Sequence, residues 1–135
     1  MFIEKIAIQA PQKGLFEITD KISKLVEKSQ VKNGLCTLFI QHTSASLLIQ
    51  ENADMAARQD LQNWFSRLVV EGDELYTHTS EGLDDMPGHI KSTLTATHLS
   101  IPIMNSKLTL GTWQGVFLWE HRRNSSARSI VVHIN

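Results

Sequence analysis

The most regular pattern in the chain is an apolar repeat between residues 57 and 68. Its members recur with the spacing of helical turns and are Ala57, Leu61, Trp64, Phe65 and Leu68. This spacing places the side chains on one face of an amphipathic α-helix. Asp54 lies just before the repeat, and its carboxylate suits the N-cap position of such a helix. We therefore expect a long helix here, with Trp64 and Phe65 packed in the core.

Short apolar runs typical of β-strands lie on both sides of this helix. The expected strands span residues 2–10, 35–41, 100–104, 107–110, 116–120 and 128–134, and a further apolar run covers 47–49. Two more helices are expected, one capped by Thr19 or Asp20 and one over residues 87–97. No repeat or linker divides the chain. The sequence thus predicts a single α+β domain over residues 1–135, with β-sandwich-like antiparallel sheets and about three helices packed alongside.

Charge and cysteine usage limit the function classes. The chain has 13 Lys and Arg against 14 Asp and Glu, so it lacks the basic excess that a general nucleic-acid binder needs. The single cysteine, Cys36, excludes an internal disulfide and fits a reducing cytosol. No apolar run reaches the length of about 18 residues that a membrane-spanning helix requires. We therefore expect a cytoplasmic protein with neither nucleic-acid nor membrane partners.

Residues 81–91 concentrate carboxylates, an imidazole and an amine in one short stretch. Pro87 suits the first turn of a helix, where unpaired backbone N–H groups and the helix dipole attract anions such as phosphate. The metal-ligand candidates in and before this stretch are His78, Asp84, Asp85 and His89. Imidazole with carboxylate suits Zn²⁺, whereas carboxylates with substrate phosphates suit Mg²⁺. The spacing matches no strong metal motif, and an acidic solvated loop that caps an ordinary helix is the alternative.

Two further polar stretches follow expected strands. Residues 42–46 read His-Thr-Ser-Ala-Ser, and these groups either hold a phosphate, move a proton, or form a polar turn that bonds its own backbone. Residues 111–115 place two glycines around Trp113 and Gln114, which indicates a bulge that can line a pocket. Glu120 and Arg122 lie at the end of the next strand, and a salt bridge explains these two residues nearly as well as a role in the site does.

Four motifs together resemble the YjbQ family, which is also described as secondary thiamine-phosphate synthase. They are residues 42–46, residues 51–54, residues 81–91, and residues 110–115 with Glu120. The resemblance implies an α+β fold on a β-sandwich core and a small cytoplasmic homotrimer with sites near the subunit interfaces. The implied activity is that of a transferase, which joins a hydroxymethylpyrimidine pyrophosphate to a thiazole phosphate, as a main or a side activity.

The resemblance also implies roles for individual positions. The implied catalytic residues are His42, His89, Glu51 and Glu120. The implied binding residues for a small phosphorylated metabolite are Thr43, Ser44, Asn52, Thr112, Trp113 and Gln114. The expected ligands of a divalent metal, Mg²⁺ or Zn²⁺, are His78, Asp85 and His89. Two positions depart from the family pattern: Leu83 replaces a common acidic residue, which weakens a carboxylate-rich cluster, and Gly88 replaces a common alanine.

Two other functions stay open on the sequence. One is a non-catalytic, metabolite-binding or regulatory trimer that uses the same pocket without turnover. The other is a metal-dependent hydrolase, which needs metal ligands closer together than the sequence alone can place them.

Overall fold

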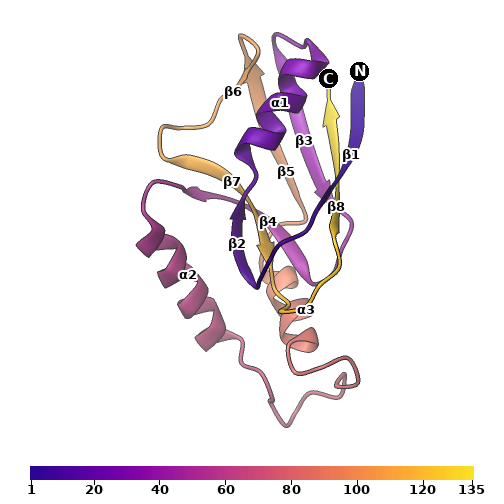
Figure 1. Cartoon of the computed structure of the whole chain (residues 1–135), viewed down its shortest axis with the longest axis vertical. Coiled ribbons are helices and arrows are strands. Elements are labelled where there is room, and N and C mark those ends of the chain that lie inside the picture. The colour runs from indigo at the N-terminus through magenta and orange to yellow at the C-terminus, as the bar shows by residue number, and fades with distance from the viewer.

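The computed structural model describes residues 1–135, and Figure 1 shows their arrangement. The chain forms eight strands and three helices. In chain order they are β1 (Phe2–Ile8), β2 (Gly14–Glu17), α1 (Thr19–Ser29), β3 (Gly34–Ile40), β4 (Ala45–Glu51), α2 (Met55–Leu68), α3 (Asp85–Leu94), β5 (His98–Met104), β6 (Lys107–Leu108), β7 (Gln114–Glu120) and β8 (Arg128–Ile134). None of the three helices is long and apolar enough to cross a bilayer.

The strands form two antiparallel sheets. One has five strands in the order β1-β8-β3-β5-β6, and the other has three in the order β2-β7-β4. The first and last strands pair along their whole length, from Phe2 opposite Ile134 to Ile8 opposite Arg128, so the two termini lie side by side (Figure 1). This architecture confirms the predicted α+β class with antiparallel sheets and helices alongside.

The main core lies between the two sheets and α1. Strand β8 shows the expected period of two: Ile130, Val132 and Ile134 are fully buried, while the residues between them are only partly covered. Helix α1 adds Ile22 and Val26 to the same cluster. Because each apolar side chain of this size contributes roughly 1.5–3 kcal/mol when it is buried, these positions dominate the stability of the sandwich.

Helix α2 packs on the outer face of the three-stranded sheet. Phe65 stacks in a tilted geometry on Trp119 of β7, with ring centroids 4.7 Å apart. The N-cap prediction for α2 is confirmed, since the Asp54 carboxylate accepts a hydrogen bond from the backbone N–H of Ala56 at 2.8 Å. The cap expected for α1 at Thr19 or Asp20 is wrong, because α1 begins at Thr19 and its N-cap is Ile18, which makes no side-chain cap bond. The prediction that Trp64 is a core residue is wrong, because its side chain is 49% exposed. Successive helical residues point about 100° apart, so Phe65 and Trp64 cannot both face a sheet that covers only one side of the helix.

Helix α3 begins and ends earlier than the predicted range 87–97. It spans Asp85–Leu94, with Pro87 in its first turn. The chain leaves the helix because the carbonyl of Ala96 accepts a hydrogen bond from the backbone N–H of Leu47, at 2.8 Å, on the edge of β4. The segment after the helix is thereby drawn against the sheet.

Gly88 lets α3 approach the sheet closely. A Cβ atom at this position would lie 3.3 Å from Cβ of Ser44 and 3.6 Å from Cβ of His121. Those two residues lie just before β4 and just after β7. The close packing therefore brings Asp85 and His89, on the same helix, to the end of the three-stranded sheet.

Candidate functional site

Helix α3 places Asp85 and His89 one turn apart, on one face of the helix. His89 Nε2 lies 3.1 Å from Asp85 Oδ2. His78, from the loop before α3, places its Nε2 at 2.7 Å from the same carboxylate oxygen. One ligand atom from each of the three residues lies within 4.8 Å of the other two. The structure thus brings together the three residues expected from the sequence to bind a metal.

The proton on His89 can be assigned from its neighbours. Nδ1 lies 2.9 Å from the backbone carbonyl oxygen of Thr43, and a carbonyl only accepts hydrogen bonds, so Nδ1 donates. In the neutral ring, Nε2 then carries a lone pair that points toward Asp85. Metal-binding histidines typically donate one ring N–H to a backbone carbonyl in this way, which orients the other nitrogen toward the metal ligands.

Asp85 is ionised although it is almost fully buried. Burial alone would raise the pKa of its carboxyl group, but the hydrogen bond from His78 and the charge of Arg122 lower this pKa below its ordinary value. Arg122 contacts the second oxygen, with 3.0 Å between Nη1 and Oδ1. One carboxylate oxygen therefore faces the guanidinium, and the other faces both histidines.

Arg122 fixes the acidic stretch from the opposite side, and its ion pairs with Asp84 and Asp85 confirm the salt bridge expected from the sequence. Its Nη2 donates to the carbonyl of Glu81 at 2.6 Å and lies 3.3 Å from Oδ1 of Asp84. Burial would raise the pKa of Asp84, but the backbone N–H of Arg123 and the Arg122 guanidinium lower it. The position of Arg122 at the end of a predicted strand did not identify its two partners, which come from a distant segment of the chain.

His42 and Glu120, both expected to be catalytic, take part in a buried network around Arg128. Arg128 Nε donates to Glu120 Oε1 at 2.7 Å, and Glu120 is fully buried. His42 Nε2 accepts the backbone N–H of Ser129 at 2.8 Å. Burial and the Arg128 charge lower the pKa of His42, so the ring is neutral near pH 7. Both side chains are thus engaged within the chain.

A polar hollow adjoins the metal-ligand group. It has a volume of about 260 Å³ and is lined entirely by polar residues. They are His42, Thr43, His89, Ser92, Thr93 and Thr97. Ser44, expected to bind substrate, lies behind this wall, where its Oγ accepts a hydrogen bond from Arg128 Nη2 at 3.0 Å. His89 therefore borders both the hollow and the metal-ligand group.

The remaining predicted residues lie at the other end of the three-stranded sheet. In the pairing of β4 with β7, Ala45 is opposite Glu120 and Glu51 is opposite Gln114. Six residues of strand separate these ends by about 20 Å. The group at the far end, called the distal group below, consists of Glu51, Asn52, Thr112, Trp113 and Gln114. Within one chain, the predicted site residues thus fall into two separate groups.

Side-chain contacts hold part of the distal group in place. Asn52 Nδ2 donates to Glu17 Oε2 at 2.9 Å, and Gln114 Oε1 accepts the backbone N–H of Gly111 at 2.7 Å. Trp113 is 64% exposed, which is a large apolar surface to leave in water.

Comparisons with known proteins agree with this fold over almost the whole chain. A family model described as UPF0047 protein YjbQ-like matches residues 4–135. A UPF0047 protein of Synechocystis sp. is 52% identical over 132 residues, which cover 98% of this chain and 90% of that protein. The UPF0047 protein YjbQ of Escherichia coli O157:H7 is 40% identical over 127 residues, which cover 93% and 91%.

Solved structures give the same result. A YbjQ-like protein of unknown function from Sulfolobus solfataricus superimposes with a TM-score of 0.89 at 28% identity, covering 98% of this chain and 95% of that one. A conserved hypothetical protein from Thermus thermophilus gives a TM-score of 0.87 at 31% identity, with 98% and 99% covered. The chain therefore belongs to the UPF0047 family of YjbQ-like proteins.

Proposed function

We propose that the protein binds a divalent cation through His78, Asp85 and His89. The observation that carries this proposal is the 3.1 Å contact between His89 Nε2 and Asp85 Oδ2. Because His89 Nδ1 donates to Thr43, a neutral His89 would point a lone pair at a carboxylate oxygen. A proton or a metal ion at Nε2 would remove that repulsion. The adjacent Nε2 of His78 is a further nitrogen ligand, and a metal ion can bind both nitrogens and the carboxylate oxygen, whereas a proton cannot.

The donor set favours a particular kind of ion. Two imidazole nitrogens and one carboxylate oxygen suit Zn²⁺ and similar first-row divalent ions, whereas Mg²⁺ prefers oxygen ligands. Arg122 binds Asp85 Oδ1, so Oδ2 is the oxygen left for the ion. Three protein ligands leave a coordination position for a substrate atom.

The substrate class follows from the hollow beside His89. Its wall carries the hydroxyl groups of Thr43 and Thr97, which can donate hydrogen bonds to phosphate oxygens. The hydroxyl groups of Ser92 and Thr93 already donate to backbone carbonyls and can only accept. A bound cation would polarise a phosphoryl oxygen and neutralise charge that develops on a leaving group. We therefore propose a small phosphorylated metabolite as the substrate.

For the reaction itself, we propose thiamine-phosphate synthase-like transfer, as the resemblance to the family implies. In this reaction, a bond between carbon and the pyrophosphate oxygen breaks, a bond from that carbon to the thiazole nitrogen forms, and pyrophosphate leaves. The protein would position the two substrates and balance the charge of the leaving group. Arg122 and the proposed cation are the positive groups at the site that are suited to this role.

Metal-dependent hydrolysis of a phosphate ester is the second candidate. It is supported by the closeness of the ligand atoms of His78, Asp85 and His89, which all lie within 4.8 Å of one another. Such a compact group with an open coordination position is the arrangement used to activate water. Binding of the metabolite without turnover is the remaining alternative.

We also propose a homotrimer in which a neighbouring copy completes the site. Two observations support it: the predicted site residues lie at opposite ends of the three-stranded sheet, and Trp113 is largely exposed. A contact between copies would cover this indole, and it could bring the distal group of one chain to the His78, Asp85 and His89 group of the next.

Metal analysis combined with turnover tests the proposal. Purified protein and its His78→Ala, Asp85→Asn and His89→Ala variants would be dialysed against Zn²⁺ and analysed by mass spectrometry, with His98→Gln as the matched histidine control. We expect about one ion per chain in the parent and control and a strong loss in the three variants. Equal metal content in all five proteins would contradict the site.

Each protein would then be supplied with the two thiamine precursors and, separately, with a phosphate monoester. Product from the paired precursors supports transfer, whereas release of inorganic phosphate supports hydrolysis. Metal binding with neither product would contradict the proposed catalysis and leave metabolite binding as the function.

A further inference from the structure

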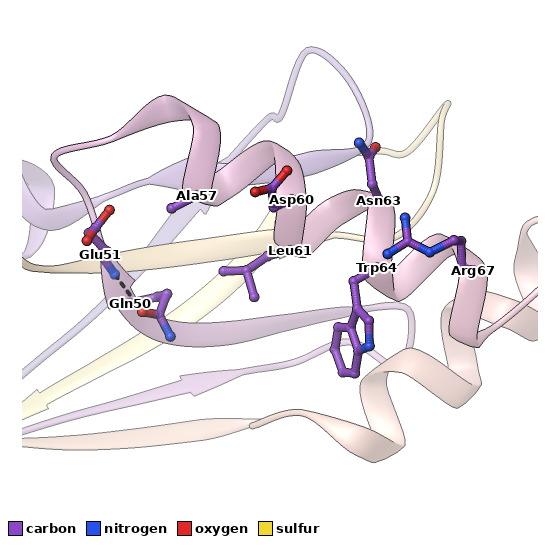
Figure 2. Close-up of a pocket in the computed structure, with 8 residues that line it drawn as sticks. All are labelled: Gln50, Glu51, Ala57, Asp60, Leu61, Asn63, Trp64 and Arg67. Atoms are coloured by element: carbon purple, nitrogen blue, oxygen red, sulfur yellow. Dashed lines mark hydrogen bonds between the residues drawn. The ribbon is translucent and has the colours of Figure 1, made fainter.

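A second, larger pocket lies between α2 and the edge strand β4 (Figure 2). Its volume is about 610 Å³, within the range of small-molecule sites. Strand β4 contributes Gln50 and Glu51, and α2 contributes Asp60, Leu61, Trp64 and Arg67 to the wall. None of these belongs to the metal-ligand group, and only Glu51 also belongs to the distal group. A ligand in this pocket therefore needs neither the proposed metal ion nor a neighbouring copy.

Trp64 gives this pocket an aromatic wall. Its side chain is 49% exposed, and its ring stacks on Phe65 with 5.7 Å between centroids and 12° between planes. Phe65 is buried, so the stacking holds the indole in one orientation. Leu61 lies one turn before Trp64 and extends the apolar surface toward Gln50 (Figure 2). A half-exposed, immobilised indole is a suitable surface for a flat ligand.

The charged groups of the pocket have no partners within the chain. The carboxylates of Glu51 and Asp60 and the guanidinium of Arg67 take part in no hydrogen bond or ion pair made by their side chains. Arg58, on the same helix, is by contrast paired with Glu17 at 3.3 Å. The lining therefore carries two free negative charges and one free positive charge.

These charges are separated along the pocket. In Figure 2, Glu51 lies at one end, Asp60 lies near the middle, and Arg67 lies beyond Trp64 at the other end. The part of the pocket near the carboxylates favours a cation, and the indole face attracts a cation as well. An N–H donor group on the ligand could satisfy the free carboxylate oxygens.

We propose that this pocket binds a small, flat organic cation with N–H donors, of the amidinium or protonated amino-heterocycle class. The flat group lies against Trp64, and its N–H groups donate to Asp60 and Glu51. The cation binds on the Asp60 side of Trp64, because the positive charge of Arg67 repels a cation placed further along α2.

Binding of benzamidinium to the full chain tests this proposal. The indole N–H signals of the three tryptophans would be followed by NMR during the titration, with Trp64→Phe identifying the Trp64 signal. We expect the Trp64 signal to shift with a Kd in the range of about 1 mM, which is typical of a fragment. Benzamide and benzoate, which have the same shape without the positive charge, should bind at least about fivefold more weakly.

Charge variants give effects of opposite sign. Asp60→Asn should weaken benzamidinium binding about five- to tenfold, and Arg67→Gln should strengthen it. Glu74→Gln removes an exposed carboxylate elsewhere and should leave the affinity unchanged. Circular dichroism would verify that each variant is folded.

Three outcomes would overturn the proposal. The first is benzoate or benzamide binding as tightly as benzamidinium. The second is an unchanged affinity in the Asp60→Asn variant. The third is a Trp64 indole signal whose position does not change with benzamidinium but does change with protein concentration. That result would show that the pocket is a contact between copies of the chain.

Discussion

Arg122 and Asp85 are in contact across the junction of β7 with α3, with 3.0 Å between Nη1 and Oδ1. This contact orients the carboxylate so that its other oxygen faces His78 and His89. The two residues are far apart in sequence, and Gly88 allows the helix to come close enough for them to meet. The positioning of the proposed metal ligand therefore depends on a residue outside the ligand group.

The first prediction concerns this positioning role of Arg122. Arg122→Gln should lower the affinity for Zn²⁺ by about 10- to 100-fold, because Asp85 loses its orienting partner. Competition with a chromophoric chelator measures this affinity. Arg123→Gln is the matched control, because Arg123 pairs with Glu71 and with Asp84 rather than with Asp85. A Zn²⁺ affinity that is equal in both variants and the parent would show that the Arg122 contact does not position the ligand.

The second prediction concerns the buried ion pair of Arg128 and Glu120. Glu120→Gln should destabilise the fold by about 3–5 kcal/mol, because it leaves a buried guanidinium without its counter-charge. Urea denaturation measures the change. Lys28→Gln, which breaks a surface ion pair with Glu4, should cost less than about 1 kcal/mol. Similar losses in the two variants would contradict a structural role for the buried pair.

The third prediction concerns the acid stability of the fold. Burial, with the nearby charges of Lys91 and Arg128, lowers the pKa of His121 from 6.5 to about 3. Between these values, the unfolded chain binds a proton that the folded chain does not, so stability falls as the pH falls below 6.5. At pH 5 this histidine alone should account for about 2 kcal/mol of lost stability.

Urea denaturation at pH 7.5 and pH 5 measures this contribution. His121→Gln cannot titrate, yet its amide can still bond Ser46, the present partner of the ring at 2.9 Å. The variant should therefore lose about 2 kcal/mol less than the parent between the two pH values. His98→Gln, at the exposed start of β5, serves as the control. An identical pH dependence in parent and His121→Gln would show that His121 is not the residue responsible.

The fourth prediction concerns assembly. Light scattering at micromolar concentration should give a mass of about three chains of 15.2 kDa. Mixing inactive His89→Ala with inactive Trp113→Ala under conditions of subunit exchange should restore part of the activity, since some mixed sites would combine intact residues from two chains. A monomer, or a trimer without complementation, would contradict a site shared between subunits.

Much of the fold follows from local sequence patterns. The strand over residues 128–134 and the cap at Asp54 both depend on residues close together in the chain, and the structure confirms them. The expected strands 100–104 and 107–110 are also found as the pair β5 and β6, and Asn105 and Ser106, both with positive φ, form the turn between them. Strand β2 has only four residues and was missed, because so short a segment has too little periodicity to identify it.

The site was harder to predict, because its geometry depends on contacts between distant segments. His78, Asp85 and His89 were identifiable by residue type, and the one-turn spacing of Asp85 and His89 follows once the helix is known. The Arg122 contact required the packing of α3 against the end of β7, which no local pattern encodes. Likewise, the engagement of His42 by the backbone of Ser129 depends on the pairing of distant strands.

Anomalous X-ray diffraction of crystals soaked in Zn²⁺ can test the claim that His78, Asp85 and His89 bind one divalent cation. Data collected on either side of the zinc absorption edge would locate the ion without reference to activity. We predict a single strong peak bounded by Nε2 of His78, Nε2 of His89 and Oδ2 of Asp85, at about 2.0–2.2 Å from each. A peak only at other residues, or no peak at this position, would contradict the claim.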